Sequence, residues 1–393
     1  MNLIEYVIQS TETFRERPLG PVDSLVFAQL SYVKFEAVLQ KQGRSLKRPR
    51  MRIRDFARNE DFPLLFSDGI TDEKNQRFLL AAAVSRRFRD IPIREIESRF
   101  SEDDVTQFAA MVFVLDDGTE YAAFRGTDGD LVGWKEDAYM TFMDEVPSQT
   151  LAVAYLNRIS KGLFGGRKPL YVGGHSKGGN LAMYGGLCAG ERARKRIKSV
   201  DSFDGPGFND ETAARLKPYR EKTTFPMTKY LPQSSIVGIL LESDEDIKII
   251  DGGGLLAEAH EAYRWYIEDN DFCYLKELTA RGEYFSRTFR DWYQSVTPEQ
   301  RMIFVDTLYK LLRENDVNSY REVVSMSPRK LFALAGTVKG LDEETRKIFL
   351  QVLRQLAKFA VFGSPKSADK EEAAATPEAP DAAGASEAPE WTL

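Results

Sequence analysis

One serine in the sequence has neighbours that are typical of a catalytic nucleophile. Residues 169–184 read PLYVGGHSKGGNLAMY, an apolar run followed by glycines around Ser176 and then a helix-like segment. The spacing Gly174-x-Ser176-x-Gly178 fits a nucleophile elbow when a strand precedes it and a helix follows it. Glycine suits both flanking positions, because a side chain there would collide with the strand and the helix. We therefore predict covalent catalysis by the Ser176 hydroxyl.

A serine nucleophile needs a base, and the chain contains only two histidines. His175 lies inside the turn and cannot easily point back at Ser176, so we expect it to be structural. His260 follows the last predicted strand, where hydrolases with this order of elements place their base. The sequence therefore predicts His260 as the general base.

The acid that would orient the imidazole is less sharply defined. Asp204 ends the strand after the nucleophile helix, in SFDGPGF, and we favour it, although Asp before Gly-Pro also suits a turn. Asp244 is the alternative. It lies in the acidic stretch 242–246, whose composition is typical of a solvated connection.

An oxyanion intermediate would need two hydrogen-bond donors. The backbone N–H of Lys177, directly after the nucleophile, is the first. The second is expected from a loop that follows an earlier strand, and FRGTDGD at 124–130 is such a loop. Thr127 could offer both its N–H and its hydroxyl there. The alternative for this loop is an ordinary polar turn.

The surrounding pattern predicts the elements that position these residues. Two apolar runs flank Asp117-Gly118 and predict a hairpin over 108–127. Apolar spacing predicts helices over 21–40, over 149–163, and from Ser176 to about residue 198. Short strands are expected at 170–174, at 199–208, and in FPMTKYLP and DIKIID. Alternating strands and helices predict a mostly parallel sheet flanked by helices, with an antiparallel edge.

The C-terminal part of the chain has a different character. We expect a hydrolase domain over 1–280, an all-helical extension over 281–363 and a disordered Ala-, Glu- and Pro-rich acidic tail over 364–393. Thr297, Pro298 and Gln300 predict a capped helix start. An apolar stripe is expected on the last helix: Ile348, Phe349, Val352, Leu353, Leu356 and Phe359. We expect it to pack on its own domain, while contact with a membrane surface stays open.

Composition excludes several classes of function. The chain has 42% hydrophobic and 29% charged residues, and the tail carries five of its six net negative charges. This balance does not favour nucleic acid as a partner, and the arginine-rich stretch 44–54 reads as a solvated loop. Two cysteines and two histidines make a zinc site improbable, and no cofactor is expected. Neither a signal peptide nor a membrane span is evident, so we expect a cytoplasmic protein.

Five segments in order resemble a known group of proteins: AAFRGTD, WKEDAYMTF, GGHSKGGNLA, SFDGPGF and PQSSIVGILLE. They resemble the lipase-like α/β-hydrolases of the bacterial Mbeg-like family, which is related to the fungal (class three) lipases. The resemblance covers about residues 15–270. It implies an α/β-hydrolase fold and ester hydrolysis with Ser176 as nucleophile, His260 as base, and Thr127 and Lys177 as oxyanion donors.

Two positions depart from the fungal pattern. Lys177 replaces a hydrophobic residue after the serine, and Ser235 stands where an aspartate is expected. The second departure favours Asp204 as the acid and leaves an incomplete triad as the alternative.

These observations predict a serine hydrolase for a small-molecule or lipid carboxylic ester. The alternative is a hydrolase-fold protein that is catalytically weak or inactive and serves as a binding module. No metal cluster or phosphate-binding loop in the sequence supports a phosphatase or nuclease. The sequence leaves the oligomeric state open.

Overall fold

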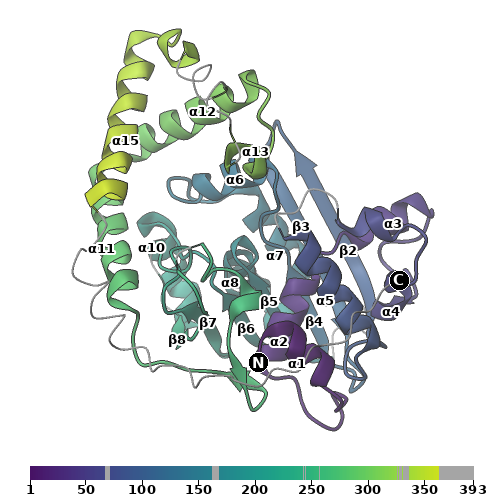
Figure 1. The fold of residues 1–393 in the computed structure, drawn as a ribbon. Helices are drawn as coiled ribbons and strands as arrows, with labels where there is room; N and C mark the ends of the chain where they lie inside the picture. The colour runs from purple at the N-terminus through teal and green to yellow at the C-terminus, as the bar shows by residue number, and fades with distance from the viewer. Residues whose placement is uncertain are drawn as a thin grey trace, which may run out of the picture.

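The computed structural model describes residues 1–66, 71–161, 168–241, 243, 245–255, 257–324, 326, 330 and 336–362. Within these residues the chain forms one eight-stranded sheet in the order β1 to β8 (Figure 1). Its strands are β1 (Met51–Arg52), β2 (Pro92–Ser101), β3 (Thr106–Val114), β4 (Glu120–Phe124), β5 (Leu170–His175), β6 (Ile197–Phe203), β7 (Met227–Pro232) and β8 (Asp246–Ile250). A short hairpin, β9 (Ile267–Glu268) and β10 (Asp271–Phe272), forms a second sheet.

The sheet is antiparallel at one edge and parallel through the rest. Neighbours from β1 to β4 pair antiparallel, and neighbours from β4 to β8 pair parallel. The predicted hairpin over 108–127 is confirmed as β3 and β4, and the predicted parallel strands are β5 to β8. Parallel strands end at the same edge of the sheet, so the loops after β5, β6, β7 and β8 meet there.

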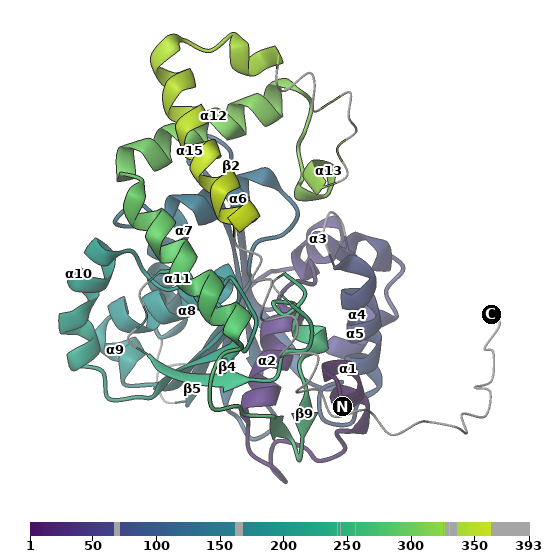
Figure 2. The same ribbon diagram turned by 60° about the vertical axis from the view of Figure 1, so that its left-hand side comes forward.

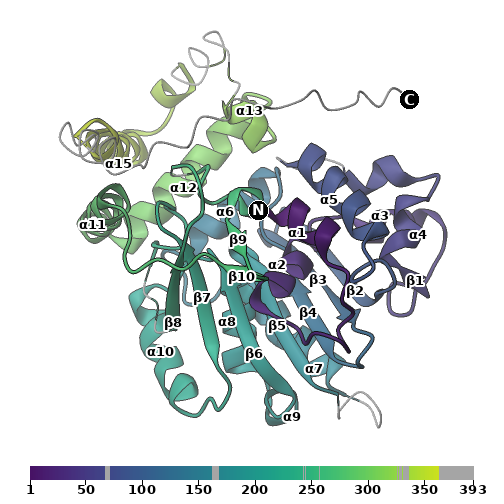
Figure 3. The same ribbon diagram turned by 60° about the horizontal axis from the view of Figure 1, so that its bottom comes forward.

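Helices cover both faces of the sheet. The described helices before residue 280 are α1 (Leu3–Gln9), α2 (Pro21–Leu30), α3 (Phe35–Lys41), α4 (Ile53–Ala57), α5 (Asp72–Val84), α6 (Leu131–Tyr139), α7 (Pro147–Ile159), α8 (Lys177–Cys188), α9 (Glu191–Arg194) and α10 (Asp210–Glu221). Figure 3 shows α1 and α2 on one side of the sheet and α7 and α8 on the other.

Side-chain alternation along the strands explains the two hydrophobic layers. On β4, Tyr121 and Ala123 face the core that contains α2 and α5, whereas Ala122 and Phe124 face the core that contains α7 and α8. Successive strand residues point to opposite faces, so a strand that is buried on both sides is apolar throughout. The predicted α/β architecture with a parallel centre is therefore confirmed.

Two predicted helices differ in extent from their expectations. The segment 21–40 contains two helices, α2 and α3, separated by a turn in which the N–H groups of Tyr32 and Val33 bond to carbonyls three residues back. The nucleophile helix α8 ends at Cys188 and not near residue 198, because a short helix, α9, intervenes before β6. The helical spacing of apolar residues continues across both breaks, so the sequence does not show where the first helix of each pair ends.

A buried ion pair holds the N-terminal segment against the helices. Arg87 and Asp23, whose side chains are fully buried, form two hydrogen bonds of 2.7 and 2.6 Å, and Tyr6 donates to the same carboxylate at 2.7 Å. Arg87 also donates to four backbone carbonyls between Glu12 and Pro18.

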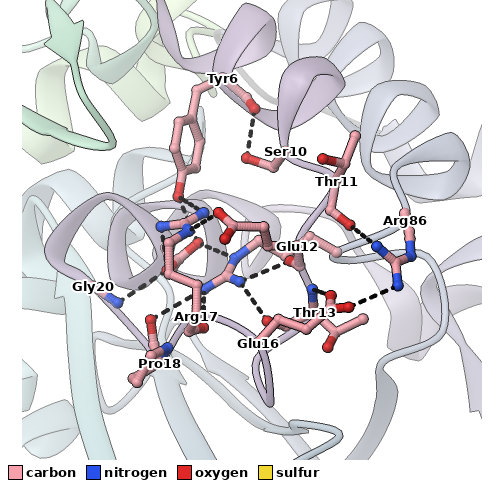
Figure 4. A network of polar contacts seen from close by, with 12 residues as sticks. Tyr6, Ser10, Thr11, Glu12, Thr13, Glu16, Arg17, Pro18, Gly20 and Arg86 are labelled. Atoms are coloured by element: carbon pink, nitrogen blue, oxygen red, sulfur yellow. Dashed lines mark hydrogen bonds and ion pairs between the residues drawn. The ribbon is translucent and has the colours of Figure 1, made fainter.

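Figure 4 shows the surrounding contacts, including Arg86 donating to Thr11 and Glu16. These contacts fix the chain that leads into α2.

The C-terminal part of the described chain is helical. It contains α11 (Ala280–Ser295), α12 (Pro298–Glu314), α13 (Tyr320–Val324) and α15 (Glu343–Phe362). Figure 2 shows α11, α12 and α15 packed together beyond one end of the sheet.

The predicted capping box of Thr297 and Gln300 is confirmed. On α15, Phe349 and Val352 are buried, whereas Leu353 is exposed, so the predicted stripe is narrower than expected; the side chains of Leu356 and Phe359 lie outside the described residues.

Candidate active site

Ser176 occupies a strained turn between β5 and α8. Its φ of 58° and ψ of −132° are unusual for a residue with a side chain. A Cβ on Gly174 would lie 2.3 Å from Gly178, and one on Gly178 would lie 2.2 Å from the Phe124 carbonyl oxygen. Only glycine therefore lets β5, α8 and the end of β4 approach so closely. The strand, the turn and the helix have the arrangement of a nucleophile elbow.

Asp204 follows β6, the neighbour of β5, and is completely buried. Its Oδ1 accepts the Gly238 N–H at 3.0 Å, and its Oδ2 accepts the Ser235 hydroxyl. The Nδ1 atom of His260 lies 2.6 Å from the same Oδ2. Such a short contact with a carboxylate fixes the imidazole with its proton on Nδ1, so Nε2 is the nitrogen free to take a proton.

His260 lies in the loop between β8 and β9, and the second histidine supports it. The rings of His175 and His260 stack with centroids 4.5 Å apart. His175 Nε2 lies 2.8 Å from the His260 carbonyl oxygen, and the Tyr32 hydroxyl lies 3.1 Å from His175 Nδ1. Burial holds the pKa of His175 well below its usual range, and the neighbouring His260 lowers this pKa further. His175 is therefore a neutral support.

The structure brings Ser176, His260 and Asp204 to one edge of the sheet. A short contact joins His260 to Asp204, whereas the Ser176 hydroxyl makes no hydrogen bond with either of them. The Ser176 N–H donates to the Phe203 carbonyl at 3.0 Å, directly before Asp204, and His175 stacks on His260. Within the described residues, the Ser176 hydroxyl has no hydrogen-bond partner. Catalytic hydrogen bonds are often long in unliganded enzymes and tighten when substrate binds. Asp244, the alternative acid, lies outside the described residues.

The predicted oxyanion donors differ from expectation in one respect. The Thr127 hydroxyl donates to Asp137 Oδ2 at 2.6 Å, so its proton is already engaged. The backbone N–H of Thr127 and that of Lys177 make no hydrogen bond with any described residue. Two unsatisfied backbone donors beside a serine elbow are suited to a developing oxyanion. The Thr127 hydroxyl therefore anchors this loop to α6.

The Lys177 side chain extends into a buried polar cluster. Its Nζ atom lies 2.9 Å from the Gln107 carbonyl oxygen and 3.1 Å from Glu136 Oε2. Glu136 also accepts the N–H groups of Gln107 and Ser148 at 3.0 and 2.9 Å. Burial lowers the pKa of Lys177, but Glu136 and Asp137 outweigh burial and raise this pKa above its ordinary value. The cluster therefore joins α8, which begins at Lys177, to α6.

Asp137 shares this cluster and contacts both Lys177 and Thr127. Its Oδ1 lies 3.8 Å from Lys177 Nζ. Burial raises the pKa of Asp137 to about 6, against the opposing effect of Lys177, of the Thr127 hydroxyl and of His260. The same carboxyl accepts the hydrogen bond of the Thr127 hydroxyl.

Comparison with known proteins places the chain in a family. The sequence profile of the Mbeg1-like family matches residues 82–310, more than half of the chain. The chain belongs to the Mbeg1-like family. A search of curated proteins gave no match. Among solved structures, a lipase from Rhizopus microsporus var. chinensis matches with 14% identity and a TM-score of 0.33, covering 65% of this chain and 76% of the lipase. Similarity this weak carries no argument about activity.

Sequence reasoning missed several residues of the site in this Mbeg1-like chain. Glu136 and Asp137 lie in WKEDAYMTF, a segment that the sequence marks only by its resemblance to the family, and Tyr32 lies far away in sequence. A lysine directly after Ser176 is a usable signal, since a buried lysine requires an acidic partner. Ser235 stands out in the sequence only as a position that lacks an aspartate, whereas in the structure it contacts Asp204.

Within the described residues, no three His, Cys, Asp or Glu side chains are grouped as a metal site would require. In the same part of the chain, none of the helices combines the length and the apolar composition needed to cross a membrane.

Proposed function

We propose that this Mbeg1-like protein is a cytoplasmic serine hydrolase that cleaves a carboxylic ester, including esters of lipids. The observation that carries the proposal is the 2.6 Å contact between His260 and the buried Asp204, beside the strained Ser176 turn. A carboxylate-oriented imidazole next to a serine on an elbow is the arrangement required for acyl transfer.

In the proposed reaction, the Ser176 hydroxyl oxygen attacks the ester carbonyl carbon while His260 Nε2 accepts the hydroxyl proton. The backbone N–H groups of Thr127 and Lys177 stabilise the resulting oxyanion. The carbon–oxygen bond to the alcohol then breaks, and His260 returns the proton to the leaving alkoxide. Water, deprotonated by His260, attacks the acyl carbon of the acyl-enzyme. The bond from this carbon to the Ser176 oxygen then breaks, His260 returns the proton to that oxygen, and the acid is released. Asp204 stays ionised and stabilises the imidazolium in both steps.

The test combines covalent labelling with turnover. Wild-type protein should react with a fluorophosphonate probe and hydrolyse short p-nitrophenyl esters. Ser176→Ala should abolish labelling, and His260→Ala should lower the labelling rate and kcat/KM by about three orders of magnitude. Full esterase activity in Ser176→Ala would refute the proposal.

The second candidate function is a hydrolase-fold protein that binds a ligand without turnover. The observation in its favour is the Ser176 hydroxyl, which has no hydrogen-bond partner among the described residues. This candidate predicts no labelling and no turnover in the wild-type protein. Labelling that depends on both Ser176 and His260 would exclude it.

A further inference from the structure

A strongly basic surface patch lies at the antiparallel edge of the sheet, around β1 and α4 (Figure 3). The segment 41–61 contains eight cations and three carboxylates, so it carries a net charge of +5 in a chain whose total is −6. The sequence predicts a solvated loop over 44–54, whereas the structure forms β1 and begins α4 within that stretch. The backbone that carries these cations is therefore fixed in place.

The patch surrounds a broad surface hollow of about 1110 Å³. Four of the cations line it, and these are Lys41, Arg44, Arg50 and Arg58. The three carboxylates of the segment line it as well. Its volume is comparable to that of the larger small-molecule sites, so it has room for several charged groups.

Two of the three carboxylates in the hollow are already engaged. Asp61 Oδ1 lies 2.5 Å from Lys41 Nζ, and this contact makes the largest contribution to holding the pKa of Asp61 below its ordinary value. Asp55 accepts the backbone N–H of Arg52 at 2.8 Å, at the start of α4. Glu60 is the remaining acid of the hollow, so the cations outnumber the carboxylates that could neutralise them.

The three arginines of the hollow have no counter-ion in the described part of the chain. Arg44, Arg50 and Arg58 are exposed, and their side chains make neither an ion pair nor a hydrogen bond with any described residue. Arg52, by contrast, contacts Asp90 at 2.9 Å. Like charges gathered around one hollow repel one another, and an anion bound among them would relieve this repulsion.

Arg50 is held in an unusual backbone conformation. Its φ of 57° lies in the left-handed region, which a residue with a side chain rarely adopts. The next residue, Met51, is buried and pairs with Ile93 of β2, and the Ile53 N–H donates to the Ile91 carbonyl at 3.1 Å. Strain of this kind persists only where the surrounding structure imposes it, and it is concentrated at functional sites. The fixed turn keeps Arg50 at the hollow.

Arginine side chains in this arrangement suit phosphoryl groups. A guanidinium is planar and donates two parallel hydrogen bonds to two oxygens of one phosphate. No aromatic side chain is among the described residues that line the hollow, so nucleic acid bases would have nothing on which to stack. We propose that the hollow around Arg44, Arg50 and Arg58 binds a ligand with two or more phosphoryl groups. Its source is either a soluble polyphosphate or the headgroup of a phospholipid with two phosphates. The proposal does not depend on the hydrolase function.

The first experiment measures the binding of inorganic tripolyphosphate to the full chain by titration calorimetry. Physiological ionic strength is used, because it screens weak attraction between exposed charges. The site variant combines Arg44→Gln, Arg50→Asn and Arg58→Gln, with asparagine at position 50 because it tolerates the left-handed conformation. Its Kd should rise by at least about tenfold, the effect of losing one charge-assisted hydrogen bond.

The control variant removes the same charge elsewhere. It combines Lys198→Gln, Lys217→Gln and Lys222→Gln, at three exposed lysines on β6 and on or just after α10. Its affinity for tripolyphosphate should stay close to that of the wild type. An equal loss of affinity in both variants would show that only the overall charge matters and would overturn the proposal.

The second experiment distinguishes the two sources by sedimentation with phosphatidylcholine vesicles that contain or lack cardiolipin. Recruitment by cardiolipin that the site variant loses and the control variant keeps assigns the site to a phospholipid headgroup. Tripolyphosphate binding without recruitment assigns it to a soluble polyphosphate. If the wild-type protein binds neither probe, or binds a uridine oligonucleotide more tightly than both, the proposal is wrong.

Discussion

At the scale of single residues, Asp204 has the environment of a catalytic acid. Ser235, Gly238 and His260 all contact its carboxylate, and Lys229 fixes the Gly238 carbonyl at 3.1 Å. Ser235 thus supports an acid on the neighbouring strand, although it stands where the fungal pattern expects the acid itself. These contacts explain how the site keeps an oriented histidine despite that substitution.

The identity of the acid can be tested by substitution. Asp204→Asn should lower kcat by roughly three to four orders of magnitude, because His260 loses the carboxylate that orients it and stabilises its charge. Ser235→Ala should lower kcat by only about tenfold, the effect of one lost hydrogen bond. Ester turnover measures both, with Asp244→Asn as control. A larger loss in Asp244→Asn than in Asp204→Asn would contradict this assignment.

Lys177 gives a second prediction at the same scale. Lys177→Met should destabilise the fold by about 3 to 5 kcal/mol, because Glu136 would remain buried without its cation. Adding Glu136→Gln should recover part of this loss, since the remaining amide carries no charge. Urea unfolding of the wild type, both single variants and the double variant measures the coupling. Additive effects would show that the two side chains do not interact.

At the scale of elements, α6 connects the C-terminal helices to the loop that contains Thr127. Its inner side carries Glu136 and Asp137, which hold Lys177 and Thr127. Its outer side carries Tyr139 and Lys135, which contact Asp306 of α12 at 2.6 and 2.9 Å. Arg301 of α12 also donates to the Thr141 carbonyl, just beyond α6, at 2.7 Å. The extension therefore fixes the helix on which the proposed oxyanion site depends.

Loosening this attachment should affect catalysis from a distance. Asp306→Ala removes two polar contacts, each worth about 1 kcal/mol, and should lower kcat severalfold while KM changes little. Steady-state kinetics measure kcat and KM separately. Asp291→Ala, which replaces an exposed acid on α11, is the matched control. Unchanged kcat in Asp306→Ala would show that α6 keeps its position without α12.

At the scale of the whole molecule, a buried carboxyl group links the N-terminal helices to the sheet. Asp201 on β6 accepts the hydroxyl of Ser24 from α2 at 2.7 Å. The same hydroxyl lies 2.8 Å from that of Tyr121 on β4. Burial raises the pKa of Asp201 from 3.8 to about 6, and the Ser24 hydrogen bond opposes this shift only in part. The folded protein thus holds the proton more tightly than the unfolded chain does.

This difference predicts how stability depends on pH. The contribution of Asp201 is fully present below about pH 4 and is lost as pH rises through about 6. Relative to Asp201→Asn, the wild-type protein should therefore lose at most about 3 kcal/mol of unfolding free energy between pH 4 and pH 7. Chemical denaturation of both proteins across this range measures it. A constant difference would indicate that Asp201 does not titrate there.

The sequence by itself determined the local parts of this protein. Glycine spacing fixed the turn at Ser176, and the strand and helix periods predicted the parallel sheet that ends beside it. The scarcity of histidine left His260 as the candidate base. These features depend on backbone sterics and side-chain periodicity within short segments, which a sequence states directly.

Only the tertiary structure decided which distant groups meet. It placed Asp204 against His260, engaged the Thr127 hydroxyl with Asp137, and buried Lys177 beside Glu136. It also placed the α12–α13 link against the loop after β4, where Asp130 pairs with Ser319. Such contacts join segments that are far apart along the chain. Which residues make these contacts depends on how loops and helices pack together. The periodicity and spacing of residues along the chain do not encode that packing.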